Sequence, residues 1–426
     1  MSVMEYKCPN CGGSISFDSQ TQKMVCPFCE AEFDVEALRQ LDEALKAENK
    51  EEMNWEGYEA GSGDWQAGEL DGIVSHLCPS CGGEIVGDQN TAATTCPYCG
   101  NPAVMTQKLS GMLRPDDVIP FKYDKESAKT ALKGFLKGKT LLPSLFHDQN
   151  QIDSITGIYV PFWLFDCDTH ADIRYHAEKV RKWSDNKYNY TERKHYKVYR
   201  SGDLGFVKIP VDGSQKMDDT YMEAIEPYNY NDLTSFQTAY LAGYLADKYD
   251  VDAESGKPRV NERIRKSIDK AFLETVTGFN SVREENTAAK IKDGKVRYAL
   301  LPVWMLNTKY KDQMYTFAMN GQTGKFIGKL PVSWPKFWGW LFGLGAGLGA
   351  IAVGISNLLD FNSSFGAVVA SLVITGFVMG GMYKKMNTAR PQSLAHNYIK
   401  EGSFQLTRKD DVYLYKRVEK KEKPKS

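Results

Sequence analysis

Two long apolar stretches without charge lie near the C-terminal end of the chain. The first, Phe337–Leu359, has 23 residues and the second, Phe365–Tyr383, has 19. About 20 apolar residues suffice to cross the hydrocarbon core of a bilayer. Because only five residues separate the two runs, the pattern predicts an α-helical transmembrane hairpin over residues 336–384. A buried helical pair in a soluble core is the alternative.

The residues around this pair predict its orientation. Asp360 is the only charge in the loop between the runs, whereas six basic residues flank the pair: Lys325, Lys329, Lys336, Lys384, Lys385 and Arg390. The positive-inside rule then predicts a two-pass protein of the bacterial cell membrane with both termini cytoplasmic. Small residues four positions apart, such as Gly343 and Gly347, suit close helix packing within the pair or in a homo- or hetero-oligomer.

Residues 109–335 combine the periodicities of helices and strands. Apolar positions recur at helical spacing in Asp124–Lys139, Asn231–Asp250 and Val260–Thr277. Alternating stretches at Gly157–Glu178 and Arg297–Pro331 predict strands, the second as an antiparallel meander. We therefore expect a soluble mixed α/β (α+β) domain, with Asp124 as the N-cap of its first helix.

Eight of the nine cysteines form two sets with the same spacing, Cys-x2-Cys-x14-Cys-x2-Cys. The sets are Cys8, Cys11, Cys26 and Cys29, then Cys78, Cys81, Cys96 and Cys99. Four thiolates complete a tetrahedral shell around Zn²⁺, so the pattern predicts two structural β zinc ribbons, over residues 1–33 and 77–108. Iron in the same four-sulfur geometry, or unligated or disulfide-bonded cysteines, are the alternatives.

The segment between the cysteine sets, residues 34–76, has two parts. Asp34–Asn49 carries apolar residues on one helical face, with Asp34 as a candidate N-cap. This helix either binds a partner or packs on its own ribbon. Asn54–Gly72 is acidic and rich in glycine, which is typical of a flexible linker, with Trp55, Tyr58 and Trp65 as anchors.

Charge is balanced overall but not locally. The formal net charge is −1, yet residues 30–77 carry a balance of −11 and residues 384–426 one of +7. The second ribbon has no Lys or Arg between Cys78 and Cys99, which disfavours nucleic-acid binding because phosphates require basic partners. The basic cytosolic tail, residues 385–426, suits anionic lipid headgroups, or is a solvated end.

One predicted strand gathers polar residues on one face. Strand alternation places six side chains together, with Cys167 on the opposite face: Asp166, Asp168, His170, Asp172, Arg174 and His176. Such a polar strand face is usually only solvated, and a metal or catalytic site is the alternative. Arg174–Arg200 reads as an exposed hairpin, or as a surface for RNA or lipid. No nucleophile elbow, HExxH or P-loop motif occurs, so we expect no enzyme, no catalytic residues and no organic cofactor.

Several stretches resemble a known family. They are CPSCGGEIVGDQNTAATTCPYCG, LRPDDVIPFKYDKESAKTAL, YLAGYLADKYDVD and NGQTGKFIGKLP before the apolar runs. They resemble bacterial TFIIB-type zinc-ribbon membrane proteins, a group also labelled primosomal-helicase-like, over most of Leu77–Tyr383. The chain has no Walker motif to match the helicase label. The resemblance implies similarity to phage-shock-associated membrane anchors, which recruit cytosolic partners.

Together these features predict a membrane-anchored, cytosol-facing adaptor. The ribbons and the α/β domain would bind cytosolic protein partners, the hairpin and basic tail would contact membrane lipids, and envelope stress response is the implied setting. The rival hypotheses are a nucleic-acid-associated zinc-ribbon protein at the membrane and an enzyme in the middle domain. The partner and the roles of His170, His176 and Cys167 are left open by the sequence.

Overall fold

The computed structural model describes residues 8, 13–28, 31–36, 38–39, 52–55, 65–88, 96–101, 105–108, 113–358, 364–386, 388 and 390–423. The fold is multi-domain and mixed α/β, as the sequence predicts for the fold class. A three-stranded sheet near the N-terminus contains β1 (Ser16–Asp18), β2 (Lys23–Val25) and β3 (Glu32–Phe33). All other described strands join a second, larger sheet.

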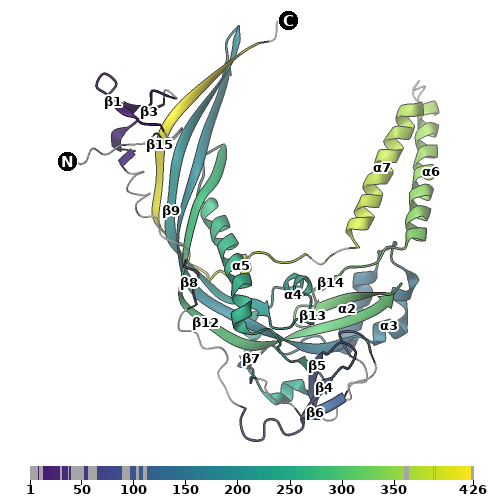
Figure 1. The fold of residues 1–426 in the computed structure, drawn as a ribbon. Helices are drawn as coiled ribbons and strands as arrows, with labels where there is room; N and C mark the ends of the chain where they lie inside the picture. The colour runs from purple at the N-terminus through teal and green to yellow at the C-terminus, as the bar shows by residue number, and fades with distance from the viewer. Residues whose placement is uncertain are drawn as a thin grey trace.

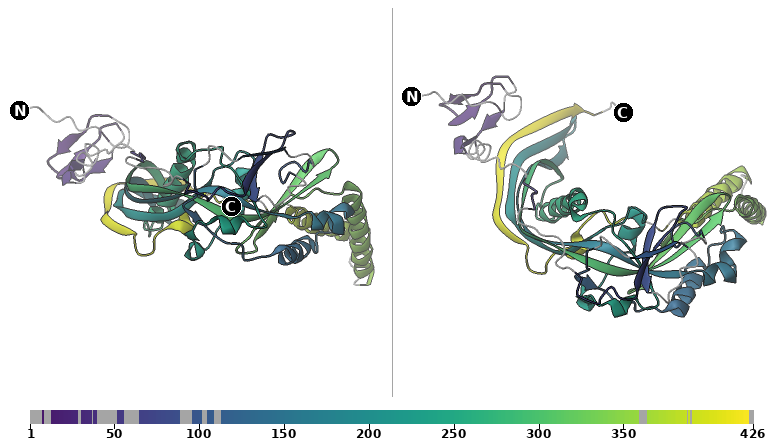
Figure 2. Two further views of the ribbon diagram at one scale, coloured as in Figure 1. Left: turned by 90° about the horizontal axis from the view of Figure 1, so that it is seen from below. Right: turned by 60° about the horizontal axis from the view of Figure 1, so that its bottom comes forward.

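Four long strands give the large sheet its shape. Their spatial order is β12-β8-β9-β15, all antiparallel, and their bounds are Ser281–Tyr310, Thr156–Ser184, Tyr188–Asp212 and Gln405–Glu422. Register shifts, for example between Phe165 and Cys167, mark irregularities of the bulge type, which bend strands. The strands curve through the molecule as an arc (Figures 1 and 2). The hairpin predicted over Arg174–Arg200 is present and consists of the end of β8, the turn after Ser184 and the start of β9.

Helix α5 (Ala253–Leu273) lies on the concave side of the arc (Figure 1). The carboxylate of Asp252 caps it by accepting a hydrogen bond from Ser255 N at 2.8 Å. One face of the helix is fully buried through residues four positions apart: Val260, Ile264, Ile268 and Phe272. The helix predicted over Val260–Thr277 is therefore confirmed, although it starts earlier and ends at Leu273.

The far end of the arc carries the predicted meander. Strands β13 (Gln313–Asn320) and β14 (Phe326–Gly328) follow β12 in antiparallel pairing. Helix α2 (Lys125–Leu136) starts at Asp124, which accepts from Ser127 N at 2.8 Å, as the sequence predicts. A 3-10 turn η1 (Ser144–His147) and the short helix α3 (Gln149–Asp153) follow it.

The helix predicted over Asn231–Asp250 is wrong. This stretch contains two 3-10 turns and two short strands, namely η2 (Tyr230–Asp232), β10 (Thr234–Ser235), η3 (Thr238–Leu241) and β11 (Leu245–Asp247). β10 pairs with β7 (Asp117–Val118), and β11 fits between β8 and β5. Tertiary strand pairing thus overrides the helical spacing of the apolar residues. Helix α4 (Asp219–Ile225) precedes this segment.

The described strands of the second cysteine set belong to the large sheet. These strands are β4 (Ile73–Leu77), β5 (Glu84–Asp88) and β6 (Met105–Lys108), and they extend the large sheet in the order β11-β5-β4-β6. The pairing of Ala246 with Val86 and of Asp247 with Ile85 makes the join. The second cysteine set and the α/β domain, which the sequence separates at residues 108 and 109, therefore share one sheet.

The expected linker is partly fixed to the core. Trp55 is buried, its indole N–H donates to Asn261 Oδ1 at 2.8 Å, and its ring meets the edge of Phe165. Trp65 packs edge-on against Phe236. Both aromatic residues act as the anchors that the sequence predicts, whereas Tyr58 and most of Asp34–Asn49 lie outside the described residues.

The basic tail expected over residues 385–426 contains a long paired strand. Residues 405–422 form β15, which pairs along β9 from Asp203 to Tyr188. β9 would otherwise present an unpaired backbone edge, and covering such an edge removes a site of aggregation. The basic residues of this segment are therefore side chains of a paired strand.

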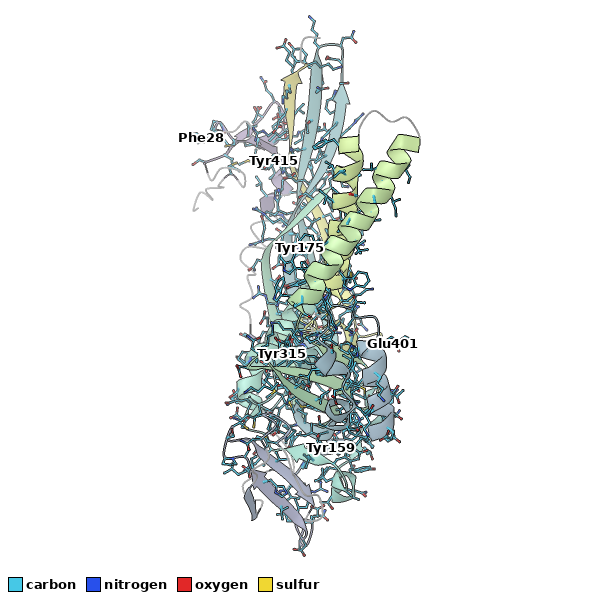
Figure 3. The ribbon with its side chains drawn as sticks, turned by 90° about the vertical axis from the view of Figure 1, so that its right-hand side faces the viewer. Phe28, Tyr159, Tyr175, Tyr315, Glu401 and Tyr415 are labelled. Carbon is cyan, nitrogen blue, oxygen red and sulfur yellow. The ribbon has the colours of Figure 1, made fainter. Side chains whose placement is uncertain are left out.

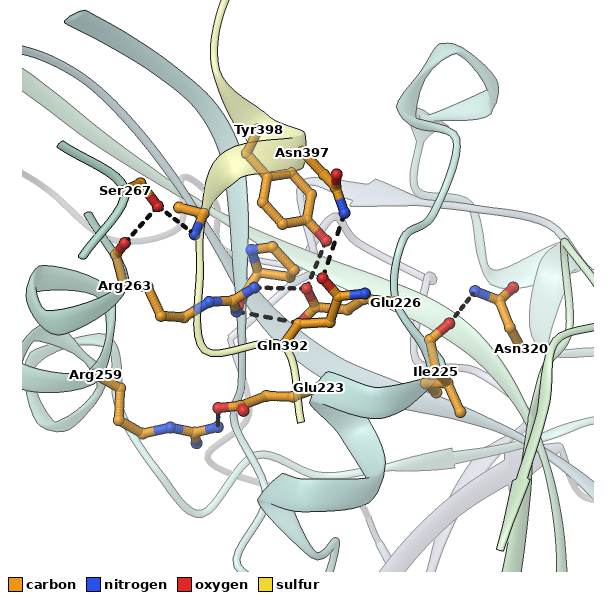
Figure 4. A network of polar contacts seen from close by, with 12 residues as sticks. Glu223, Ile225, Glu226, Arg259, Arg263, Ser267, Asn320, Gln392, Asn397 and Tyr398 are labelled. Carbon is orange, nitrogen blue, oxygen red and sulfur yellow. Dashed lines mark hydrogen bonds and ion pairs between the residues drawn. The ribbon is translucent and has the colours of Figure 1, made fainter. Parts of the chain in front are cut away.

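A buried ion pair fixes the chain where it returns to the core (Figure 4). Arg263 of α5 binds Glu226 through Nη2 to Oε2 at 2.6 Å and Nη1 to Oε1 at 3.1 Å. Tyr398, in the 3-10 turn η4 (His396–Tyr398), donates its hydroxyl to Glu226 Oε2 at 2.6 Å. Because all three side chains are buried, they hold the segment before β15 firmly against α5.

Two apolar helices project from the far end of the arc (Figures 1 and 2). They are α6 (Trp334–Leu358) and α7 (Ser364–Lys384), and they pack against each other. Only Trp334–Ile355 meets the length and hydropathy of a membrane span among the described residues, because the described apolar part of α7 is the shorter Val368–Lys384. The expected two-span transmembrane hairpin is thereby corrected to one candidate span.

Candidate metal centre

The second cysteine set converges at the end of β4. Cys78 follows β4, and Cys96 and Cys99 precede β6, so pairing of β4 with β5 and β6 brings both knuckles together. The sulfur atoms of Cys78, Cys81, Cys96 and Cys99 all lie within 4.8 Å of one another. These four residues, predicted from their spacing, could hold a metal ion.

The distances between the sulfur atoms fit a shared ion. Cys78 Sγ lies 3.7 Å from Cys99 Sγ, and Cys81 Sγ lies 3.6 Å from Cys96 Sγ. Four sulfurs bound tetrahedrally to zinc at about 2.3 Å stand about 3.8 Å apart. A disulfide would need about 2.05 Å between sulfurs, so the disulfide alternative is wrong for these four cysteines.

The backbone of the two knuckles is built alike. Cys78 N donates to Gly83 O and Cys96 N donates to Asn101 O, both at 2.9 Å. Gly82 and Gly100 close the turns with φ of +70°, a conformation that favours glycine. The loops therefore present each pair of sulfurs from a rigid turn.

The electrostatics of the cluster favour a cation. Burial opposes ionisation of Cys78, but the N–H groups of Cys81 and Ser80 and the nearby thiols outweigh it and lower the pKa of Cys78 to about 7. Burial raises the pKa of Cys81 and of Cys96. Burial therefore opposes ionisation of Cys81 and Cys96, and a bound metal would supply the positive charge that stabilises their thiolates.

Side chains from distant parts of the chain support this cluster. Asn307 of β12 donates its amide to the carbonyls of Pro97 and Tyr98, and Lys216 Nζ donates to Cys81 O at 2.7 Å. The Tyr98 ring lies so close to Gly83 that an added Cβ would be 2.6 Å from it. The cluster is thus part of the core of the large sheet.

The first cysteine set repeats the same backbone pattern. Cys8 N donates to Gly13 O at 2.6 Å and Cys26 N donates to Ala31 O at 3.0 Å, at the same offset as in the second set. Both Cys8 and Cys26 are buried. Cys11 and Cys29 lie outside the described residues, so a second four-cysteine cluster stays a prediction.

The described part of the first set packs against the middle of β9 and β15, near Tyr415 in Figure 3. Phe33 meets the edge of the Tyr415 ring at 5.8 Å between centroids. Leu38, from the start of the predicted amphipathic helix, is buried in the same cluster as Phe33, Cys8 and Cys26. Through Leu38, the start of the predicted helix therefore packs on its own ribbon and on β9 and β15.

The chain has a relative in Bacillus subtilis (strain 168). This relative is the "Uncharacterized protein YdjG". The two sequences are 37% identical over 345 residues, which cover 81% of this chain and 95% of that protein. The chain belongs to the YdjG family. No family model matches the chain, and no solved structure matches it. Membership of the YdjG family therefore assigns no activity and no ligand to the cysteine cluster.

The polar strand face predicted on β8 is present. Cys167 is buried on the opposite face, where burial raises the pKa of its thiol. His170 Nδ1 lies 2.8 Å from Asp203 Oδ1, and Asp172 Oδ1 accepts a hydrogen bond from Ser201 at 2.6 Å. The predicted residues of this face are thus shared among local contacts and do not meet at one point.

One group on this face was missed by sequence reasoning. His176, Glu178 and His195 place three ligand atoms within 4.8 Å of one another. Burial lowers the pKa of both histidines. In the register of the hairpin that turns after Ser184, Glu178 lies opposite His195. Predicting this register from the sequence would have predicted the group.

Proposed function

We propose that the chain is a membrane-anchored adaptor that presents zinc ribbons and an α/β body to protein partners at the cytoplasmic face of a bacterial cell membrane. The observation that carries the proposal is the exposed apolar helix α6. The candidate span Trp334–Ile355 has a mean hydropathy of 1.6, and none of it is buried within the protein.

The exposure and position of α6 distinguish a membrane span from a core helix and from a signal sequence. A core helix of a soluble protein would be mostly buried, and a signal sequence would lie near the N-terminus. Phe342 on α6 and Phe377 on α7 instead stay 69% and 79% exposed. An exposed apolar surface of this size is unfavourable in water, and insertion into a bilayer would bury it.

The connections of the helical pair indicate on which side the body lies. The chain enters α6 after β14 and, beyond α7, returns through η4 to pair along β9. Both ends of the pair therefore lead into the same folded body, and we place that body on one side of the membrane, with α6 inserted and α7 packed against it. Basic residues at the base of the pair, including Lys336 and Lys384, favour the cytoplasmic side.

We assign Zn²⁺ to both cysteine sets as a structural ion. Closed four-sulfur shells leave no position for a substrate or water. The ribbons then serve as rigid surfaces, and the first of them presents Phe28 with 74% exposure at the edge of the molecule (Figure 3). An exposed aromatic residue beside a non-basic surface suits a protein partner better than a nucleic acid.

A charge substitution on α6 tests the membrane anchor. Ile351 is 60% exposed and lies within the candidate span, so Ile351→Asp should be harmless in water but should cost up to about 2.5 kcal/mol inside a membrane. We expect the wild-type chain to sediment with membranes and resist alkaline carbonate, and I351D to lose this resistance. Val418→Asp, on β15, is the matched control and should behave as wild type. A wild-type chain found free of membranes contradicts the anchor.

Proximity labelling from the N-terminus of the full chain tests the adaptor role. We expect specific proteins to be labelled at the membrane, and Phe28→Ala to reduce that set severalfold without changing the amount of chain. Leu145→Ala, which removes an exposed apolar side chain far from the ribbon, is the control. Labelling equal to background, or salt-sensitive binding of purified chain to single-stranded DNA, would replace this proposal.

A further inference from the structure

Two histidines and a glutamate that belong to neither cysteine set converge on the β8–β9 hairpin. His176 Nε2 lies 3.1 Å from His195 Nδ1, and Glu178 Oε1 lies 3.8 Å from the first and 3.5 Å from the second. All three atoms therefore face one another. Facing nitrogens with a carboxylate oxygen are a ligand set that Zn²⁺ and related ions accept.

The size of this triangle matches a metal ion. The point equidistant from the three atoms lies about 2.0 Å from each, and zinc bonds to imidazole nitrogen and carboxylate oxygen measure about 2.0–2.2 Å. An ion could therefore bind with little movement of the side chains. Three protein ligands leave at least one position open, as in the His₂Glu sites of zinc enzymes.

Neighbouring groups hold the three side chains in place. Arg193 Nη1 lies 3.4 Å from Glu178 Oε2, which leaves Oε1 turned toward the histidines. The His195 ring stacks on Tyr415 of β15 at 4.5 Å between centroids. Such outer contacts orient metal ligands and restrict their rotation.

The charges around the group are mixed. Lys197, Arg283, Arg193 and Arg417 contribute positive charge, whereas Glu285 and Glu178 contribute negative charge. Lys197 is paired with Glu285, which neutralises part of the positive field. The side chains of His176, His195 and Glu178 keep 20%, 10% and 23% exposure, so an ion can enter from solvent.

We propose that His176, Glu178 and His195 form a third metal site, which takes a divalent transition ion of the zinc type and keeps a position open for water or a ligand. The site is independent of the adaptor proposal. Its position beneath Tyr415, whose ring also meets Phe33, places the ion where β9, β15 and the first ribbon come together.

Metal content of the full chain tests this site. The probes are Zn²⁺ by elemental analysis and Co²⁺ by absorption, added to purified full-length chain in detergent. We expect the wild type to bind one equivalent more than His176→Gln and Glu178→Gln. His170→Gln is the matched control, because His170 lies on the same strand face but contacts Asp203, and it should retain the extra equivalent.

The cobalt spectrum separates this site from the ribbons. Sulfur-to-cobalt charge-transfer bands report the cysteine sites, and their persistence in H176Q and E178Q shows that these variants are folded. The extra equivalent should add only ligand-field bands of a nitrogen and oxygen site. Equal metal content in the wild type, H176Q and E178Q overturns the proposal, as does loss of the extra equivalent in H170Q.

Discussion

The two cysteine sets have the same spacing but different surroundings. The first set lies beside its own three-stranded sheet and contacts the body through one apolar cluster in the middle of β9 and β15. In the second set, the strands that the structure describes extend the large sheet instead. Phe28 in the first set is 74% exposed, whereas Tyr98, at the same place in the second, is partly buried and packs against the core beside Asp247. The spacing of the cysteines therefore determines the local structure of the knuckles. It does not determine how much of the surrounding fold depends on them.

The largest expected difference comes from removing one ligand in each set. Cys96→Ser should destabilise the full chain by more than about 3 kcal/mol, because loss of a metal site embedded in the core is among the costliest single changes. Cys26→Ser should change the main thermal transition by less than about 1 kcal/mol, since its cluster is peripheral. Circular dichroism on heating, with zinc content measured in parallel, checks both.

Both variants should lose one zinc per chain, which provides the internal control for this pair. If C26S lowers the main transition as much as C96S does, the first ribbon is as deeply integrated as the second. The contrast between a peripheral and an embedded module would then be wrong.

The sequence predicts the knuckles well because their geometry is local. Cys-x2-Cys spacing and the following glycines determine the turn, and the described Cys78, Cys81, Cys96 and Cys99 meet as predicted. The same holds for α2, whose start at Asp124 depends on a single local hydrogen bond.

Features that depend on distant strand pairing escape prediction. β11 pairs with β8 and β5, and β15 pairs with β9, across long sequence separations. No local periodicity encodes such neighbours, so the sequence predicts a helix over Asn231–Asp250 and a tail over residues 385–426. The convergence of His176, Glu178 and His195 escapes for the same reason, because it depends on the register between β8 and β9.

A smaller difference should follow from adding one methyl group to equivalent glycines. A Cβ at Gly83 would meet Tyr98 at 2.6 and 2.8 Å, and one at Gly13 would meet Phe28 at 2.5 and 3.1 Å. The Tyr98 ring is held in the core, whereas the exposed Phe28 ring can rotate away. Gly83→Ala should therefore cost about 1–3 kcal/mol of unfolding free energy, and Gly13→Ala much less. Thermal unfolding of both variants measures the difference, and equal costs would contradict it.

The smallest expected difference concerns pH and one carboxylate near each module. Burial raises the pKa of Asp247, which lies beside Tyr98 and Ser214, to about 7. In the first module, the N–H of Gln20 donates to Asp18 at 2.8 Å and lowers the pKa of that exposed carboxyl. The two groups should therefore act on stability with opposite sign.

For Asp247 the folded state binds more protons than the unfolded state between about pH 4 and pH 7, so its contribution to stability falls as pH rises through that window. Asp247→Asn removes this loss and should stabilise the chain at pH 8 relative to pH 5 by on the order of 2 kcal/mol against wild type. Asp18 contributes stability above its unfolded pKa, which is lost as pH falls, so Asp18→Asn should have a slight opposite effect. Thermal unfolding of wild type, D247N and D18N at both pH values tests the signs. A pH response of D247N identical to wild type would show that Asp247 is ionised in the folded chain, and the second module would then tolerate charge as readily as the first.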